Sequence, residues 1–212
     1  MPIFLISFLI FLGVYTWKLK QVKSNYKDYV EEFMEAEQKA SWIRKKPIED
    51  LPLIEIDLSH LPIWEKEPAY ESEKNIWLQQ KKVLETATLP MVNLTTQNNL
   101  DLKLQYGPAN LEALTDYESN FIRFLQYIIM WGKALQEANY TKEAIQVLEY
   151  GVHIGSDLSQ NYILLADLYQ TNHDTQKLAP LLEQASSHSS LNMKKANEYI
   201  YDLLHESNTE SL

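Results

Sequence analysis

The side chains that could do chemistry in this 212-residue chain are numerous but scattered. The five histidines are His60, His153, His173, His188 and His205. His153 and Asp157 lie four residues apart, as two metal ligands on one helix would, but Gly155 interrupts the helix between them. No second pair of ligands at metal-binding spacing accompanies them. The sequence therefore predicts no metal site.

Groups suited to acid–base or nucleophilic catalysis do not form a recognisable constellation either. The acidic run within residues 65–73 is typical of a solvated face, and the serines of 186–190 lack the Gly-x-Ser-x-Gly turn of a hydrolase. The absence of cysteine excludes disulfides, thiolate zinc sites and thiol nucleophiles. The five glycines are too scattered for a phosphate-binding loop. We expect neither an enzyme nor a bound cofactor.

Composition places the chain among globular proteins, with 45% hydrophobic and 23% charged residues. Acidic residues outnumber basic ones by 29 to 19, which gives a formal net charge of −10. Binding to nucleic acid requires a basic surface, so nucleic acid is not an expected partner.

One pattern occurs twice, at an offset of 34 residues. Three pairs of small or aliphatic positions share this offset: Gly132 and Ala166, Ala144 and Leu178, and Gly151 and Ala185. Large side chains recur beside them, namely Ile128, Trp131, Leu135 and Leu148 in the first copy and Tyr162, Leu165, Tyr169 and Leu182 in the second. A third, half-length copy contains Ala196, Tyr199, Ile200 and Leu203, which predicts a capping helix.

This pattern resembles the tetratricopeptide (TPR) repeat, a helix–turn–helix unit of the same length. The resemblance implies an all-α fold in which the first helices of successive repeats line a groove for a peptide or partner helix. The corresponding groove positions are Gln126, Ile129, Lys133, Gln136, Gln160, Ile163, Asp167 and Gln170. The alternative is that these residues form only a solvated face, with Ile129 in the core.

The chain departs from the TPR pattern at three places. Ser156 and Ser190 stand where a closing proline is common, and Pro180 falls within the second return helix, which must kink or begin near Ala179. The TPR domains that clamp a carboxylate need polar residues where this chain has Ile129 and Ile163, so that class of ligand is not expected.

Residues 1–17 are predicted to form a transmembrane anchor, because 3–17 contain no charge. Four lysines follow at Lys18, Lys20, Lys23 and Lys27. By the positive-inside rule, these lysines predict a single-pass cell-membrane protein with its N-terminus outside and its C-terminal domain in the cytoplasm. A cleaved signal peptide is the alternative interpretation.

Residues 18–46 are predicted to form a stalk helix with apolar residues at alternating spacings of three and four. The seam comprises Leu19, Val22, Tyr26, Tyr29, Phe33, Ala36, Ala40 and Ile43. It predicts either a parallel coiled coil that makes a homodimer through 19–43 or a helix packed on its own repeat domain. Pro47 is expected to end the helix.

The remaining segments connect the stalk to the repeats. Residues 47–67 are predicted to be a Pro-rich extended strap along the helical core, and 68–118 a helical packing layer whose first helix spans 68–87. Within that layer, 91–107 is predicted to be either a hairpin or an irregular loop. A capping box at Thr115 and Glu118 precedes the repeats at 119–206 and a tail at 207–212.

Together these features predict a membrane-anchored, non-catalytic scaffold or adaptor that binds a protein or peptide in a TPR-like groove. The Lys-heavy, Arg-poor composition suggests a bacterial protein. Two alternatives remain open: a structural membrane protein that binds other copies of itself, and an accessory regulatory subunit of a membrane complex.

Overall fold

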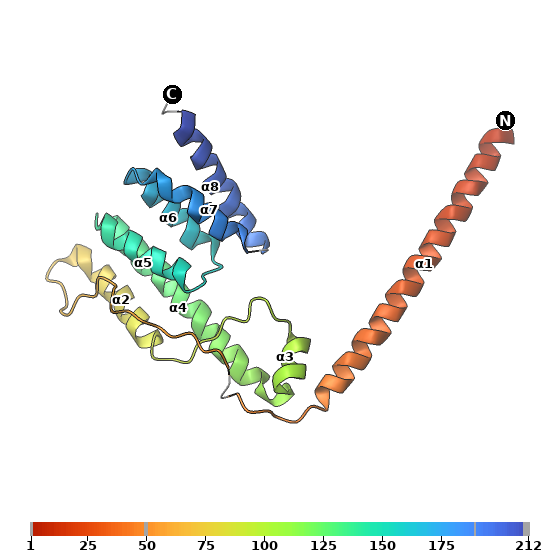
Figure 1. The fold of residues 1–212 in the computed structure, drawn as a ribbon, viewed down its shortest axis with the longest axis horizontal. Coiled ribbons are helices and arrows are strands. Elements are labelled where there is room, and N and C mark those ends of the chain that lie inside the picture. Colours follow the sequence, from red (N-terminus) through yellow and green to blue (C-terminus); the bar gives the residue numbers. More distant parts are fainter. Residues whose placement is uncertain (1, 49–50, 189, 210–212) are drawn as a thin grey trace. The chain divides into compact units, whose positions relative to one another are not determined.

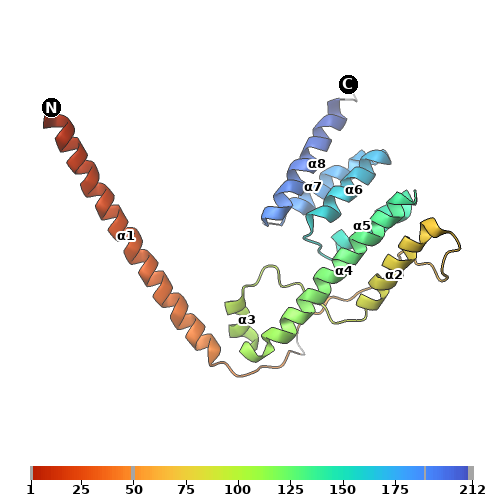
Figure 2. The same cartoon turned by 180° about the vertical axis from the view of Figure 1, so that it is seen from behind.

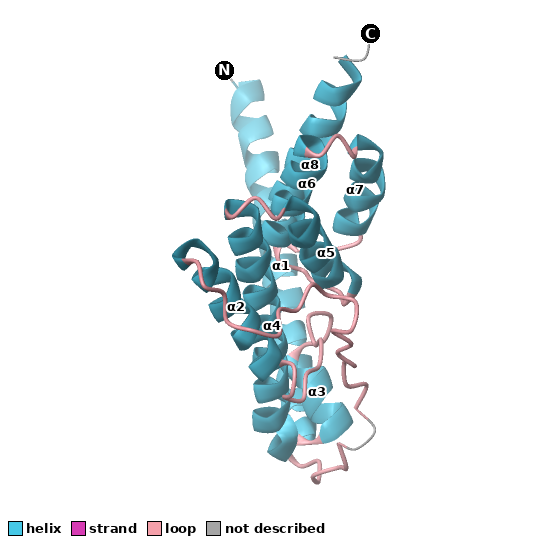
Figure 3. Cartoon of the chain, turned by 90° about the vertical axis from the view of Figure 1, so that its left-hand side faces the viewer, coloured by secondary structure: helices cyan, strands magenta, loops and turns pink. Residues whose placement is uncertain are grey.

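The structure is a computed structural model that describes residues 2–48, 51–188 and 190–209. In these residues, the regular structure consists of α-helices and short 3-10 helices, with no strand (Figure 3). The predicted all-α class is therefore confirmed for the described chain. The α-helices are α1 (Pro2–Ser41), α2 (Lys74–Thr86), α3 (Asn99–Tyr106), α4 (Leu111–Glu137), α5 (Thr141–His153), α6 (Ser159–Thr171), α7 (Leu178–Ser186) and α8 (Leu191–Thr209) (Figure 1).

The chain divides into two compact units. The first unit comprises Met1–Asp50 and Thr95–Ala113, and the second comprises Leu51–Leu94 and Leu114–Leu212. The packing layer expected over 68–118 is thus shared between two units. The predicted tail is helical as far as Thr209, and residues 210–212 lie outside the described chain.

In the first unit, the end of α1 packs against α3. Ala40 is fully buried, and the Lys103 ammonium donates to the Glu37 carboxylate at 2.6 Å. The Asn110 side-chain amide donates to the carbonyls of Lys46 and Tyr106, at 2.7 Å and 2.6 Å. These bonds tie the chain that follows α1 to the C-terminal end of α3.

The helix α1 ends at Ser41, five residues before the position at which Pro47 was expected to end it. Its last turn tightens, since the Trp42 and Ile43 amides bond to carbonyls only three residues back. The Lys46 amide then donates to the Tyr106 carbonyl at 3.2 Å, which holds this segment in a non-helical path. Contacts with α3 therefore end the helix earlier than the proline would.

Large apolar side chains are exposed along most of α1. Between Phe4 and Phe33 they include Phe8, Ile10, Phe11, Trp17, Val22, Tyr26 and Tyr29. Of the predicted seam, Ala40 is buried, Ala36 and Ile43 are half-buried, and the residues from Leu19 to Phe33 are exposed. Among the described residues, no helix combines the length and the apolarity needed to cross a membrane.

Of the two alternatives for 91–107, the hairpin is wrong, and the irregular loop holds only up to Asn98, because Asn99–Tyr106 forms α3. The Asn98 side chain caps this helix by accepting from the Asp101 amide at 2.9 Å. Leu102 and Tyr106, four residues apart, share its buried face. The alternation of leucines at 100, 102 and 104 suggested a strand, but it lies on a capped helix.

Two other helix starts differ from the prediction. Thr115 lies inside α4, which begins at Leu111 after the 3-10 turn Pro108–Asn110, so the proposed capping box is wrong. The helix expected to begin at Pro68 begins later, with the 3-10 turn Glu71–Glu73 leading into α2. In both cases a 3-10 turn supplies the first turn.

In the second unit, two helix–turn–helix hairpins have the same geometry at the predicted offset. Asn139 and His173, 34 residues apart, both adopt positive φ, at 66° and 60°. The next residue's amide bonds five residues back in both hairpins, from Tyr140 to Leu135 at 2.9 Å and from Asp174 to Tyr169 at 2.8 Å. The helices α4 and α6 end at equivalent residues, Glu137 and Thr171. The internal repeat seen in the sequence is therefore also present in the structure.

Small residues at the repeat positions let the helices approach closely. A Cβ added to Gly132 would lie 2.7 Å from Leu148 Cγ on α5, and one added to Gly151 would lie 3.0 Å from the Asn161 amide on α6. The Asn161 amide also donates to the Leu148 carbonyl at 3.1 Å. Helices α6, α7 and α8 pack in succession beyond this point (Figure 2). Pro180 stands in the first turn of α7, so that helix starts late as predicted.

The segment Leu51–Glu67, here called the strap, packs on the second unit's helices, as expected. The Gln80 side chain bonds both the amide and the carbonyl of Trp64, each at 2.8 Å. The Gln146 amide donates to the His60 carbonyl at 3.1 Å, and the Trp64 ring meets Tyr140 edge-on. The strap is thereby held by both α2 and α5.

We predict that Gly132→Ala lowers the free energy of unfolding of the repeat unit. In an open helix the same change would stabilise by about 1 kcal/mol, but here the methyl group meets Leu148, and overpacking costs about 1–3 kcal/mol. Urea unfolding followed by circular dichroism measures the difference. Gly13→Ala is the matched control, because its added methyl meets no atom within 4 Å. A Gly132→Ala protein about 1 kcal/mol more stable than the wild type, as in an open helix, would contradict the close approach.

Candidate functional site

Four of the eight predicted groove residues line one hollow in the second unit, here called the α4–α6 groove. They are Gln126, Ile129 and Lys133 on α4 and Gln160 in the first turn of α6. The groove has a volume of about 420 Å³. Its remaining lining residues are Met130, Asp157, Leu158, Ser159 and Asn192. Helices from two repeats and the cap thus contribute to one concavity.

The groove has an apolar floor and a polar rim. Ile129 is almost wholly buried, as the alternative interpretation expected, while Met130 is 44% exposed. Gln126, Lys133 and Gln160 present exposed side chains at the rim. Lys133 lies 3.8 Å from Glu137 in a solvent-exposed pair that constrains it little. Such a surface is suited to an apolar side chain flanked by groups that accept hydrogen bonds.

Negative charge gathers beside this groove. Burial raises the pKa of the half-buried Glu118 carboxyl, and the nearby Asp157 carboxylate raises it further. Asp157 lines the groove, so both signs of charge are present there, with Lys133 on α4. The lining of the groove therefore includes one basic and one acidic side chain.

The other four predicted residues lie outside the groove. Gln136, Ile163, Asp167 and Gln170 are half-buried. Asp167 accepts a hydrogen bond from the Tyr199 hydroxyl on α8, which engages the carboxylate in packing the capping helix. The hollow therefore does not extend over these four positions of α4 and α6.

Sequence reasoning missed the groove contributions of Met130, Leu158 and Asn192. Leu158 precedes α6 and Asn192 begins α8, so neither belongs to the stripe derived from helical periodicity. The offset of 34 carries a usable signal, because Leu158 lies 34 residues before Asn192. Both residues therefore occupy the same place in successive repeats.

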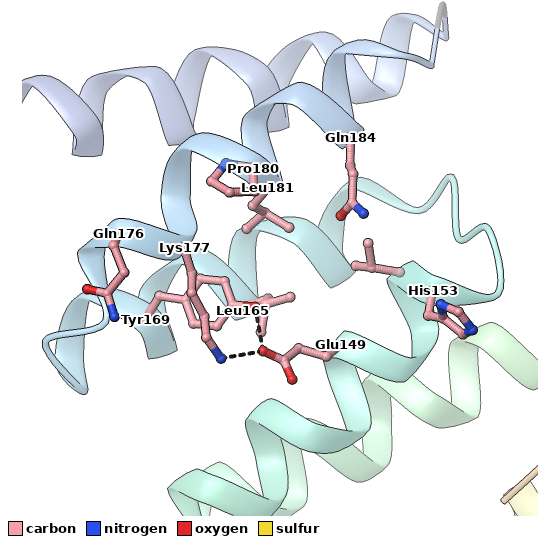
Figure 4. A pocket seen from close by; sticks show the side chains of 10 residues that line it. Glu149, His153, Leu165, Tyr169, Gln176, Lys177, Pro180, Leu181 and Gln184 are labelled. Atoms are coloured by element: carbon pink, nitrogen blue, oxygen red, sulfur yellow. Dashed lines mark hydrogen bonds and ion pairs between the residues drawn. The ribbon is translucent and has the colours of Figure 1, made fainter. Parts of the chain in front are cut away.

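A second hollow, here called the α5–α7 cleft, opens between the return helices of the two repeats (Figure 4). Its volume is about 310 Å³. Glu149 and His153 line it from α5, Leu165 and Tyr169 from α6, and Gln176, Lys177, Pro180, Leu181 and Gln184 from the second turn and α7. Glu149 Oε1 accepts from both the Tyr169 hydroxyl and Lys177 Nζ, each at 2.8 Å. Burial and this carboxylate both raise the pKa of Tyr169.

Possible metal ligands do not gather in either hollow. Within residues 2–48, 51–188 and 190–209, no three His, Cys, Asp or Glu side chains are grouped as metal ligands. His153 and Asp157, the spaced pair noted in the sequence, line different hollows. In the α5–α7 cleft the Glu149 carboxylate is neutralised by Lys177 and also accepts a hydrogen bond from Tyr169. Such a cluster suits packing and binding. The groups present can hydrogen-bond and exclude water.

Comparisons with known proteins place no constraint on these sites. No protein-family model matches the chain, and neither the curated proteins nor the solved structures gave a significant match.

Tyr162, at the centre of the second repeat, yields a pH-dependent prediction. Its side chain is 1% exposed, its hydroxyl donates to the Ser156 carbonyl at 2.9 Å, and burial raises its pKa to about 12. An unfolded tyrosine ionises near pH 10, so its contribution to stability is complete below pH 10 and is lost as the pH rises toward 12. The loss is at most about 1.4 kcal/mol per pH unit.

Unfolding free energies measured from pH 9 to 12 are expected to fall more steeply for the wild type than for Tyr162→Phe. The exposed Tyr201→Phe provides a control, which we expect to follow the wild type. Parallel curves for the wild type and Tyr162→Phe would contradict the proposed burial effect.

Proposed function

We propose that this protein is a non-catalytic adaptor that binds a peptide or helix of a partner protein in the α4–α6 groove. One observation carries the proposal: an apolar floor and exposed polar side chains from successive structural repeats meet in a single groove. Peptide-binding sites need such a combination, in which an apolar anchor gives affinity and amides or charges fix the register. The resemblance to TPR repeats supports the same use of these helices.

The proposal includes attachment to a membrane through α1. The exposed apolar side chains from Phe4 to Trp17 need a covering medium, and lipid would supply one. Lys18, Lys20, Lys23 and Lys27 follow directly, so they would lie at the headgroups. Anchoring would keep the groove and its partner near the cytoplasmic face.

A crosslinking experiment tests the adaptor function. A photo-crosslinking amino acid at Gln126 is expected to capture one partner in cells, whereas the same group at the exposed Lys142 on α5, which lines neither hollow, should not. Combining the Gln126 probe with Lys133→Glu and Gln160→Arg should reduce the yield about tenfold or more, because both substitutions alter the rim.

Lys194→Glu, on the exposed surface of α8, is the matched charge control and should leave the yield unchanged. Capture that survives the groove substitutions, or that occurs equally from Lys142, would overturn the proposal. Circular dichroism of each variant confirms that the helices remain folded.

A second candidate function is self-association through α1. Val22, Tyr26, Tyr29 and Phe33 form an exposed apolar stripe at the spacing of a coiled-coil seam. In a parallel pair, however, Lys18 would face the other copy's Lys23, and Glu32 would face its Glu37. Like charges at these flanking positions oppose that pairing, so we rank the adaptor function first.

Sedimentation in detergent distinguishes the two candidates. If α1 pairs, a concentration-dependent dimer should form and be lost in Tyr29→Glu combined with Phe33→Glu, since each change buries a charge in the seam. Swapping Lys27 and Glu31 on the opposite side of the helix preserves their ion pair and should leave the dimer intact. A monomer at all concentrations would exclude self-association.

A further inference from the structure

The strap occupies a place in the first repeat that corresponds to the α5–α7 cleft in the second. Adding 34 to Gln146 and Tyr150, which face the strap, gives Pro180 and Gln184, which line the cleft. The same step takes Trp131 and Leu135 of α4 to Leu165 and Tyr169 of α6, also in the cleft.

Three observations show the strap covering this part of the first repeat. The Gln146 amide donates to the His60 carbonyl, and the Trp64 ring lies against Tyr140 at the hairpin turn. Burial raises the pKa of Tyr150, while the neighbouring Asp57 acts on it in both directions, its backbone lowering the pKa and its carboxylate raising it. Leu61 is 8% exposed within the apolar core. The chain thus seats one of its own extended segments on a return helix of the repeat.

From this equivalence we propose that the α5–α7 cleft binds an extended segment of a partner protein, with aliphatic side chains around a proline as in the strap. Pro180 is exposed at the cleft, and the buried Val152, Leu165 and Leu181 line it beneath, so that its lining is apolar where such side chains would enter. A volume of about 310 Å³ accommodates one or two of them. The strap itself supplies the occupant's chemistry, since its residues 57–64 read DLSHLPIW.

The cleft also carries the polar groups that an extended backbone requires. In the first repeat, side-chain amides of Gln80 and Gln146 bond the strap's backbone. Gln176 and Gln184 are exposed at the cleft, on its second-turn and α7 sides. Lys177 can meet an acidic residue such as the strap's Asp57, because its side chain remains 45% exposed while paired with Glu149. An extended peptide has no internal partners for its amides and carbonyls, so these donors and acceptors favour it over a helix.

The inference does not depend on the α4–α6 groove, because the groove and the α5–α7 cleft share no lining residue. The test uses the full chain and a fluorescent peptide of residues 55–66, EIDLSHLPIWEK, with fluorescence anisotropy as the readout. We expect saturable binding that is weakened about tenfold or more by Gln184→Trp, which fills the cleft from α7. His153→Trp fills it from α5 and should act alike, and both positions are exposed, so the fold tolerates them.

Gln126→Trp fills the α4–α6 groove and serves as the matched control, which should bind the peptide as the wild type does. A scrambled peptide should not bind. The inference is overturned if the strap peptide does not bind, or if Gln184→Trp and His153→Trp bind it normally. Loss of binding only in Gln126→Trp would also overturn it, while supporting the α4–α6 groove as a peptide site.

Discussion

The close approach of helices at Gly132 and Gly151 is the constraint on which the repeat unit depends. Leu148 fills the space that a side chain at 132 would take, and Asn161 fills the corresponding space at 151 while bonding the Leu148 carbonyl. These contacts join α4, α5 and α6 with little freedom to slide. Both hollows are lined in part by these helices, so the close approach at Gly132 and Gly151 positions one wall of each.

Periodicity in the sequence was most informative where packing repeats. The offset of 34 placed both hairpins, and the structure adds equal turn geometry at Asn139 and His173 that residue types alone do not reveal. Positive φ is uncommon outside glycine, although asparagine and histidine adopt it more often than most residues. Both hairpins need this backbone conformation at the position where the chain reverses. The two repeats therefore share backbone conformation at positions where their residue types differ.

Local patterns misled where tertiary contacts decided the outcome. The alternating leucines near 102 suggested a strand, yet one Asn98 cap and the burial of Tyr106 favoured a helix. The α1 boundary was set by bonds to the end of α3, which no local signal near Pro47 announces. Four of the eight residues in the predicted groove stripe line one hollow, whereas Asp167 does not, because Tyr199 bonds it from 32 residues away. A helical wheel shows which residues share a face of one helix, but it does not show which residues from distant parts of the chain pack against that face.

The strap also has a consequence for the order in which the protein folds during synthesis. His60 bonds Gln146, 86 residues later, so this part of the chain leaves the ribosome well before its partner on α5 exists. Closing so long a loop is slow compared with forming a helical hairpin. The strap's aliphatic residues therefore stay exposed to solvent until α5 has been synthesised. During this interval they are accessible to a chaperone that binds exposed apolar segments.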